Sequence, residues 1–338
     1  MVDKSISSID RIVAMYVGPN TETTQIAAEV LTPEHPAQIT LFQNLFFKPF
    51  TSFSTSFSIP NMVQPGCELT AQLANKEVGF AEFAHSLANH LCDCIAGIEG
   101  TEGVLFVVES EELVFNAQAY KGYVLSYFRD EELFITHADM GNGVQIDFNR
   151  GLISRKPERS MLLILTEEGW VVFNQGVFEP LDGIWEEAFI PLEVRKDHMN
   201  LTSGVMHMAK TFIAEKIPEH FEIDRADQID LLNRTAGYFK NKQQFNQEEF
   251  GAEVLRDEKV VASFNEFDRE FRTTHDLPME PDFQIAPDVV KKQGRVFKSI
   301  LKLDKNFHIY IHGDRSLIHR GQEPDGRKFY KVYFQNED

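Results

Sequence analysis

Short apolar runs alternate with charged or glycine-containing turns between residues 103 and 173. The runs cover residues 104–108, 113–117, 123–128, 133–135, 144–148, 161–165 and 171–173. Runs of this length at this spacing are typical of strands that are joined by short connections. The pattern therefore predicts a largely antiparallel sheet in the first half of the chain.

Three further patterns precede this sheet. Two apolar runs around Gly18-Pro19-Asn20 predict an opening hairpin over residues 6–31. Phenylalanines crowd residues 42–57, and because only one lysine lies among them we interpret them as core side chains rather than as a platform for nucleic-acid bases. Apolar residues at three-and-four spacing predict an amphipathic helix over residues 77–95.

Helical periodicity returns after Trp185. Apolar side chains recur at three-and-four spacing through residues 201–212 and again through residues 229–239. Asn246 with Glu249 has the spacing of a helix start signal, and Ser263 with Glu266 has the spacing of a capping box. We therefore predict a helical middle region whose acidic residues form a solvated outer face.

The fold class that these patterns predict is α+β, with a largely antiparallel N-terminal sheet domain, a helical middle and a small basic antiparallel sheet at the C-terminus. Pro278, Pro281 and Pro287 predict a linker before that last sheet. The length suits about two domains. We place them at residues 1–180, a mixed domain with the larger sheet, and residues 181–338, the helical region followed by the basic sheet.

Strand periodicity reappears in residues 291–334. Phe307, Ile309 and Ile311 alternate with polar neighbours, as in a strand with one packed face. Pro324-Asp325-Gly326 has the composition of a tight turn, and the apolar run 329–334 follows it. We predict an antiparallel meander, with residues 296–303 as a further strand, in which alternate basic side chains line up on one face.

Charge divides the sequence at the same place. Residues 291–334 carry a net charge of +7, whereas the whole chain carries −19 and the residues before 291 carry −24. A local basic surface can neutralise DNA phosphates, although lysines on an exposed sheet also serve to solvate it, and charge alone leaves both interpretations open. The candidate phosphate contacts are Lys298, Lys302, Lys305, Arg315, Arg320, Arg327, Lys328 and Lys331, with Tyr310 and His308 as candidate groove or sugar contacts.

The sequence contains no familiar catalytic signature. It has no Walker loop and no Gly-x-Ser-x-Gly elbow. His308 and His312 are four residues apart, which on a strand is about 13 Å and too far for one metal ion. Acidic clusters such as residues 109–112 are typical of solvated turns, although distant carboxylates could still converge into a nuclease site. We predict a non-enzymatic protein without a metal or cofactor.

Apolar runs and cysteines bear on the compartment. The longest apolar runs are strand-sized, and the first residues lack the apolar segment of a secretory signal. Three cysteines, two of them only two residues apart, give no disulfide framework. We expect a cytoplasmic protein with no membrane partner.

Eight stretches carry a family resemblance. They are FKSILKLDKNFHIYIHG (297–313), FYKVYF (329–334), NRTAGYFKNKQQFNQEEF (233–250), SFNEFDREF (263–271), DHMNLT (197–202), IWEEAFI (184–190), HSLANHL (85–91) and QIDFNRGLI (145–153). Together they resemble the bacterial nucleoid-associated protein family of the NdpA type, in the family's order and over most of the chain. None of them is a catalytic signature.

The resemblance implies a cytoplasmic protein of the nucleoid that binds double-stranded DNA with little sequence preference. It supplies no DNA-contact residues, so the basic contacts above are inferred from charge alone. One alternative is an acidic interaction scaffold for a DNA-processing protein such as a topoisomerase. A metal-dependent nuclease is the other. A homodimer, if one forms, would present two basic faces to DNA.

Overall fold

The computed structural model describes residues 2–19, 29–52, 55–129, 132–141, 143–152, 156–275, 277–297, 300–304, 306–310 and 317–336. The chain divides into two compact units, Met1–Arg195 and Lys196–Asp338. The first contains a large antiparallel sheet, and the second contains most of the helices and the C-terminal strands. The predicted α+β class is confirmed.

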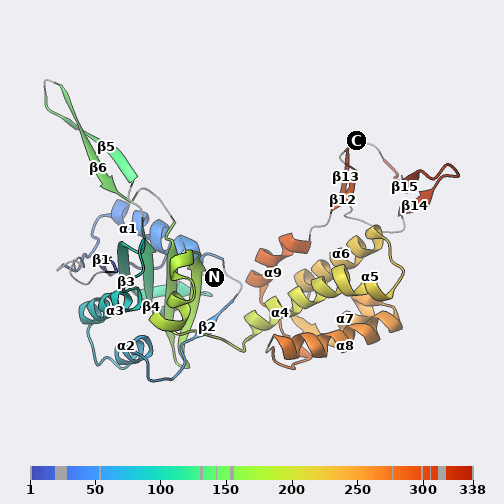
Figure 1. Cartoon of the computed structure of the whole chain (residues 1–338), viewed down its shortest axis with the longest axis horizontal. Coiled ribbons are helices and arrows are strands. Elements are labelled where there is room, and N and C mark those ends of the chain that lie inside the picture. Colours follow the sequence, from blue (N-terminus) through green and yellow to red (C-terminus); the bar gives the residue numbers. More distant parts are fainter. Residues whose placement is uncertain are drawn as a thin grey trace. The chain divides into compact units, whose positions relative to one another are not determined.

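A seven-stranded antiparallel sheet forms the centre of the first unit (Figure 1). Its order is β1-β3-β4-β7-β8-β2-β9. The strands are β1 (Arg11–Val17), β2 (Phe57–Ser58), β3 (Gly103–Phe115), β4 (Gln118–Phe128), β7 (Arg159–Thr166), β8 (Gly169–Gly176) and β9 (Glu193–Val194). Each apolar run predicted from the sequence lies wholly or mostly in a strand.

Helices cover both faces of this sheet. They are α1 (Pro36–Phe42), η2 (Gln43–Phe47), η3 (Lys48–Phe50), α2 (Pro65–Ala74), α3 (Phe80–Cys94), η4 (Glu179–Leu181) and η5 (Ile184–Phe189). The apolar stripe of α3, with Phe83 and Leu87, packs into the main core on one face. On the other face Phe46 is fully buried, 5.5 Å from the ring of Phe106. Phe46, Phe47 and Phe50 of the phenylalanine tract are therefore core, as predicted, whereas Phe53 lies outside the described residues.

One expectation for the first unit is wrong, and another falls partly outside the described residues. Of the opening hairpin expected over residues 6–31, residues 20–28 are not described; Leu31 forms an antiparallel bridge with Ile12, and β1 also pairs along its whole length with the distant strand β3. The domain boundary at residue 180 falls too early. Trp185 and Phe189 of η5 are fully buried in the core of the first unit.

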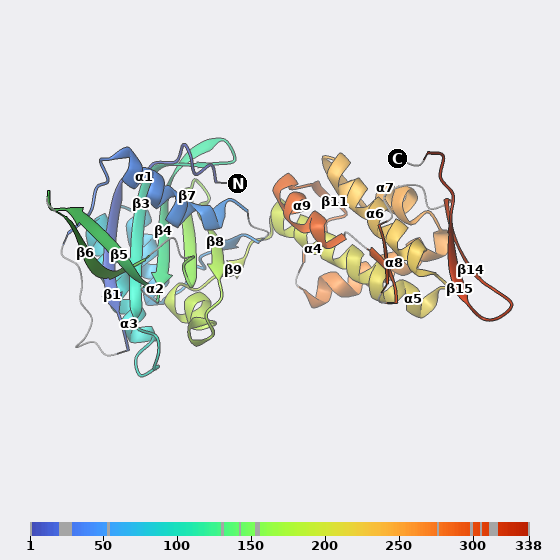
Figure 2. The same ribbon diagram turned by 90° about the horizontal axis from the view of Figure 1, so that it is seen from above.

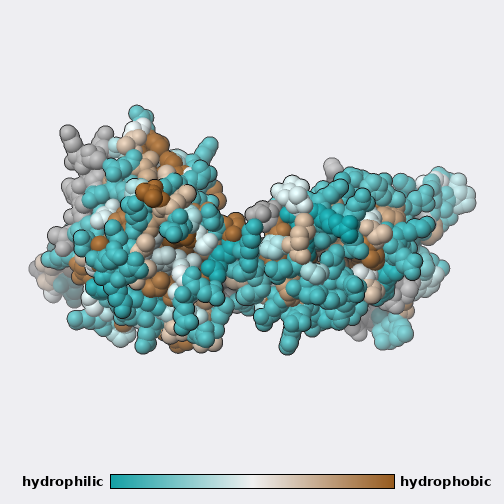
Figure 3. Space-filling view, turned by 90° about the horizontal axis from the view of Figure 1, so that it is seen from below, coloured by the Kyte–Doolittle hydropathy of each residue, from teal (hydrophilic) through white to brown (hydrophobic). Residues whose placement is uncertain are grey.

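A core rich in aromatic side chains holds the second unit together. Its elements are α4 (His198–Thr211), η6 (Phe212–Lys216), α5 (Ile217–His220), α6 (Arg225–Asn241), β10 (Gln244–Asn246), α7 (Gln247–Phe250), η7 (Gly251–Leu255), α8 (Glu258–Thr274), β11 (Asp282–Gln284), α9 (Pro287–Gln293) and η8 (Gly294–Phe297). Phe239, Phe245 and Phe250 contact one another in this core. The face of this unit that Figure 3 shows is mainly hydrophilic, as expected of solvated helices.

The start signals in the helical region had mixed outcomes. Asn246 caps α7 by accepting from the backbone N–H of Glu249 at 2.7 Å, which confirms that signal. The capping box at Ser263 is wrong, because α8 already begins at Glu258. The carboxylate of Asp257 caps it by accepting from the N–H groups of Lys259 and Val260.

The predicted proline linker is a packed part of the second unit. Phe283 and Ile285 are buried in its core, and β11 pairs with β10. Pro287 is the first residue of α9, a position where proline is favoured because its missing N–H is not needed there. The further strand predicted over residues 296–303 is also shorter than expected, since a 3₁₀ turn ends at Phe297 and the strand begins at Ile300.

A two-stranded ribbon projects from the first unit (Figures 1 and 2). It consists of β5 (Glu132–Asp139) and β6 (Val144–Gly151), paired in antiparallel register along eight residue pairs. We call it the arm.

Across the ranges that the structure describes, no helix combines the length and the apolar character needed to cross a membrane.

Candidate nucleic-acid interface

The C-terminal strands form two separate hairpins (Figure 1). One pairs β12 (Ile300–Leu303) with β13 (Phe307–Tyr310), and the other pairs β14 (Ile318–Gln322) with β15 (Lys328–Val332). Within the described residues no ladder joins β13 to β14. The basic antiparallel sheet is therefore present, but the predicted continuous meander is wrong.

Both hairpins are anchored to α6. Leu301 of β12 and Ile318 of β14 are buried in one small cluster with Ala226 and Ile229 of that helix. The helix begins there because the carboxylate of Asp224 accepts from the N–H of the residue three positions on, in a capping box. The apolar ends of the hairpins thus lie against the acidic beginning of α6.

The turn of the second hairpin is the one that the sequence predicts. Gly326 has a φ of +88°, which glycine adopts without strain, and its N–H donates to the carbonyl of Glu323 at 2.9 Å. The carboxylate of Asp325 accepts from the backbone N–H of Arg327 at 3.0 Å and from its Nε at 2.7 Å. These hydrogen bonds lower the pKa of Asp325. Arg327 is 82% exposed, but part of its charge is already balanced within the turn.

Register places the basic residues of this hairpin on two faces. Arg320 pairs with Tyr330 and Gln322 with Lys328, so Arg320 and Lys328 share the face that Ile318 begins. Lys331 pairs with His319 and belongs to the opposite face. The basic side chains of the two strands therefore line up on one face for Arg320 and Lys328 but not for Lys331, because the side chains of a strand alternate between faces at every residue.

Aromatic side chains that the charge argument missed accompany Lys331. Its Nζ lies 4.9 Å from the centre of the Tyr333 ring, a cation–π distance. The same ring meets His319 edge-on at 5.5 Å. Phe329 covers the backbone of Gly321 so closely that a Cβ there would lie 2.3 Å from its ring. The alternation of aromatic residues with lysine in residues 329–334 is the signal that could have identified them.

The first hairpin turns its polar side away from α6. Leu301, Leu303 and Ile309 contribute to the cluster with the helix, and His308 and Tyr310 alternate with them and are exposed. Lys302 pairs with His308, but only its backbone is described. Three other predicted contacts lie outside the described residues: Lys298, Lys305 and Arg315.

Most cations of the second hairpin have no carboxylate partner among the described residues. Arg320, Lys328 and Lys331 are exposed, and none of the ion pairs among the described residues joins them to an acidic side chain. Arg327 is the exception, and its partner Asp325 belongs to the same turn. Three cations of this hairpin are thus free to meet an external anion.

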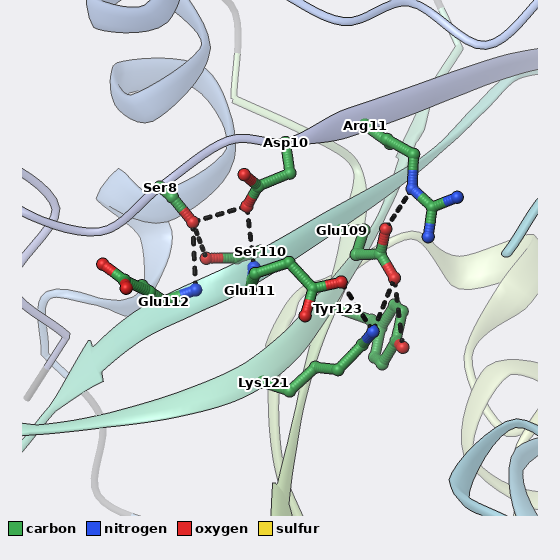
Figure 4. A network of polar contacts seen from close by, with 9 residues as sticks. All are labelled: Ser8, Asp10, Arg11, Glu109, Ser110, Glu111, Glu112, Lys121 and Tyr123. Carbon is green, nitrogen blue, oxygen red and sulfur yellow. Dashed lines mark hydrogen bonds and ion pairs between the residues drawn. The ribbon is translucent and has the colours of Figure 1, made fainter. Parts of the chain in front are cut away.

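A second polar cluster lies at the bulged edge of the large sheet (Figure 4). The register of β3 against β4 shifts between Ser110 and Leu113, so that Glu111 and Glu112 together lie opposite the single residue Lys121 and one residue of β3 is extra. The N-terminal segment satisfies their backbone groups. Asp10 accepts from the N–H of Glu111 at 2.7 Å, and Ser8 accepts from the N–H of Glu112 at 3.0 Å.

Glu109 is the buried centre of this cluster, with 1% of its side chain exposed. It accepts from Nε of Arg11, from Nζ of Lys121 at 3.1 Å and from the hydroxyl of Tyr123 at 3.3 Å. Lys121 also reaches Glu111 at 2.7 Å. Burial opposes the charge of Lys121, but these hydrogen bonds more than offset it and raise its pKa. Burial also raises the pKa of Tyr123 to about 12.

This arrangement satisfies a buried carboxylate and fixes the bulge. Two carboxylates, those of Glu109 and Glu111, converge on Lys121, whereas the carboxylate of Asp10 is turned to the bulge backbone. Among the described residues, no three His, Cys, Asp or Glu side chains are grouped so that they could hold a metal ion. Sequence reasoning treated these acids as solvated turns. For Glu109 that interpretation is wrong, because it pairs with residues from two other strands.

Comparison of the chain with protein-family models gives no match, and comparison with curated proteins gives none either. The resemblance to the nucleoid-associated family therefore stays a prediction, and the site must be judged on its own geometry.

Proposed function

We propose that the protein binds double-stranded DNA without base preference, as a component of the bacterial nucleoid, and that the β14–β15 hairpin makes the principal contact. The observation that carries the proposal is the exposure of Arg320, Lys328 and Lys331 without carboxylate partners among the described residues. Side chains of this kind neutralise phosphates and displace condensed counterions, which supplies most of the free energy of nonspecific binding.

Cations lie on both faces of the β14–β15 hairpin. This distribution favours insertion of the hairpin along a DNA groove over docking of a single face on the duplex. A two-stranded ribbon fits the major groove of B-DNA, which is about 12 Å wide. Cations on both faces of such a ribbon can reach the phosphate rows that border the groove on either side. Contacts to phosphates fix position but carry no sequence information, so this geometry supports binding with little base preference.

The net charge of −19 opposes such a contact only weakly at physiological salt. At physiological ionic strength the Debye length is about 8 Å, and exposed charges beyond that distance are largely screened. Acidic residues elsewhere in the chain contribute to the net charge. A phosphate at the hairpin, however, interacts mainly with the cations that lie within about one Debye length of it. The acidic balance still lowers affinity at low salt, where screening is weaker.

Titration of a labelled duplex with the full-length protein at several salt concentrations tests the proposal. In the test variant Arg320, Lys328 and Lys331 are all changed to Glu. In the matched control the exposed residues Lys76, Lys240 and Lys259 are changed to Glu, which alters the net charge equally. The test variant should lose most affinity, and its log–log salt slope should become shallower by roughly 3, about 0.9 per lost phosphate contact. The control should retain the slope of the wild-type protein.

Other outcomes separate the alternatives. No duplex binding by the purified wild-type protein at low salt would contradict direct DNA binding and favour the scaffold for a DNA-processing protein. Equal losses in the test and control variants would remove the hairpin as the contact. Inspection of the same duplex on a gel after incubation with Mg²⁺ or Mn²⁺ tests the nuclease alternative, since cleavage that Glu109→Gln abolishes would require a catalytic role for the buried cluster.

A further inference from the structure

The arm exposes a largely apolar face, which also carries His137 opposite Ile146. Register places five large side chains together on it, and each is between 59% and 67% exposed. They are Leu133, Ile135, Val144, Ile146 and Phe148. The opposite face is mainly polar, with Phe134 half-buried against Gly151 at its base, and there the side chain of Asn149 donates to the hydroxyl of Thr136 at 2.9 Å. Such one-sided exposure is expected of a surface that is covered in the working form of a protein.

An isolated two-stranded ribbon is marginally stable in water. The arm projects beyond the body of its unit (Figure 1), so the sheet lends it no second layer. Covering its apolar face would supply the layer that a stable sheet needs.

Charge at the two ends of the face identifies the occupant. Arg150 lies at the base of the apolar face, opposite Leu133, and Asp139 lies at its tip, opposite Val144. Six residues of strand separate the two ends, or about 20 Å. When two such faces pack with the ribbons running in opposite directions, each Arg150 comes to the same end as Asp139 of the partner subunit. Packing in the same direction would instead bring the two arginines together.

We propose that the arm joins two copies of this chain, apolar face against apolar face and with the ribbons antiparallel. A two-fold interface of this kind uses the same patch on both copies, so each face supplies the apolar surface that its mate requires. At roughly 100 Å² of exposed surface for each of five side chains, two copies together bury about 1,000 Å², the lower bound for a specific interface.

Nucleic acid is a poorer occupant of this face. Residues 132–151 contain three acids, Glu132, Asp139 and Asp147, against the single cation Arg150, so the arm carries a net charge of −2. An acidic ribbon repels a polyanion, and apolar side chains gain little from contact with phosphates. The inference is independent of the proposed DNA binding, because it concerns other residues and is tested without DNA.

Sedimentation velocity of the full-length protein over ~1 to ~100 µM tests the proposal. The wild-type protein should pass from monomer to dimer in this range. Asp139→Arg and Arg150→Asp should each raise the dimer dissociation constant by about tenfold, since either change places like charges at both ends of the interface. The double variant, with both changes, should recover most of the wild-type affinity. Asp147→Arg, the matched reversal on the polar face, should leave dimerisation unchanged.

The double variant shows whether the weakening comes from the changed charges or from damage to the tip turn. The carboxylate of Asp139 also accepts from the N–H of Gly141 at 2.8 Å in the tip turn, so Asp139→Arg removes a turn hydrogen bond as well as a charge. If loss of the turn caused the weakening, adding Arg150→Asp would not restore the dimer. A monomer at every concentration, equal weakening by Asp147→Arg, or no recovery in the double variant would each overturn the proposal.

Discussion

Replacing Asp268 by Asn should destabilise the helical unit selectively. Arg272 is 1% exposed, and its Nε donates to the carboxylate of Asp268 at 2.7 Å. One terminal nitrogen of Arg272 donates to the carbonyls of Pro278, at 2.5 Å, and Glu280, at 3.1 Å. The pair thus ties α8 to the segment that leads into β11 and α9.

The expected cost follows from the burial of the guanidinium. Asn keeps an accepting oxygen near Arg272 but removes the only charge shown to balance it among the described residues. Arginine stays protonated at any ordinary pH, so it cannot escape by titration. Breaking a buried ion pair by removal of one partner costs about 3–5 kcal/mol. Because Arg272 keeps its two carbonyl acceptors, we expect a value near the lower end, about 3 kcal/mol.

Urea unfolding with two probes measures this cost. Both tryptophans, Trp170 and Trp185, are buried in the core of the first unit, so their fluorescence reports that unit. Circular dichroism at the helical band reports mainly the second unit, which holds α4 to α9. With a slope of roughly 2 kcal/mol per molar urea, the helical transition should shift by about 1.5 M and the tryptophan transition should not shift.

A double change supplies the control. Asp268→Leu combined with Arg272→Met removes both charges, and replacing a buried pair with apolar side chains is far less costly than orphaning one partner. The double variant should therefore be more stable than Asp268→Asn, although it loses the two bonds to carbonyls. A shift of less than ~1 kcal/mol for Asp268→Asn, or an equal shift of the tryptophan transition, would refute the reasoning.

Two further predictions concern local features of the helical unit. Asp257→Ala removes the N-cap of α8 and should cost about 1 kcal/mol in urea unfolding, whereas Ser263→Ala, inside the helix, should change stability by less than ~0.5 kcal/mol. The reverse order would mean that α8 begins at the capping box suggested by the sequence. Burial raises the pKa of Tyr238 from its ordinary 10.0 to about 12. A raised pKa favours the protonated hydroxyl in the folded state, so this contribution to stability is complete below pH 10 and is lost as the pH rises toward 12. Tyr238→Phe should flatten the fall in helical-unit stability over that range, and an unchanged alkaline profile would contradict this account.

Local patterns predicted most of the fold. Short apolar runs between charged or glycine-containing turns predicted β3, β4, β7 and β8 of the large sheet, and three-and-four spacing predicted α3, α4 and α6, because these patterns reflect the burial of a single element. The composition of Pro324-Asp325-Gly326 predicted its turn for an equally local reason, since only the middle of a tight turn requires those backbone angles.

The failures involve partners far apart in the sequence. Residue pattern shows that Ile12 belongs to a strand, but not that its neighbours pair with β3 about ninety residues later. The prolines between residues 278 and 287 are typical of a linker, yet the carbonyl of Pro278 is held by Arg272, whose role depends on its burial. Glu109 resembled its solvated neighbours because Arg11 and Lys121 are brought to it only by the sheet.

In the candidate site, too, the features set by neighbouring residues were predicted, and those set by strand pairing were not. Net charge identified the C-terminal hairpins, but the faces on which Arg320, Lys328 and Lys331 lie depend on a register that charge does not encode. A shift of one residue would have moved each side chain to the opposite face. The alternation of Phe329 and Tyr333 with lysine was visible in the sequence, and the cation–π contact of Lys331 with Tyr333 is local to that run, but the edge-on contact of Tyr333 with His319 needed the pairing of β14 with β15.

The two proposals reinforce each other while remaining separable. A hairpin with three free cations makes few phosphate contacts, so a single copy should bind duplex weakly and lose that binding as salt rises. Two copies joined through their arms would present two such hairpins, and the second contact would form at the effective concentration set by the tether, with a gain of about 10²- to 10⁴-fold where the geometry allows both. Because the proposed phosphate contacts lie in the hairpin and not in the arm, a charge reversal at Asp139 should weaken DNA binding by preventing the dimer. A charge reversal at Lys331 should weaken it by removing a phosphate contact.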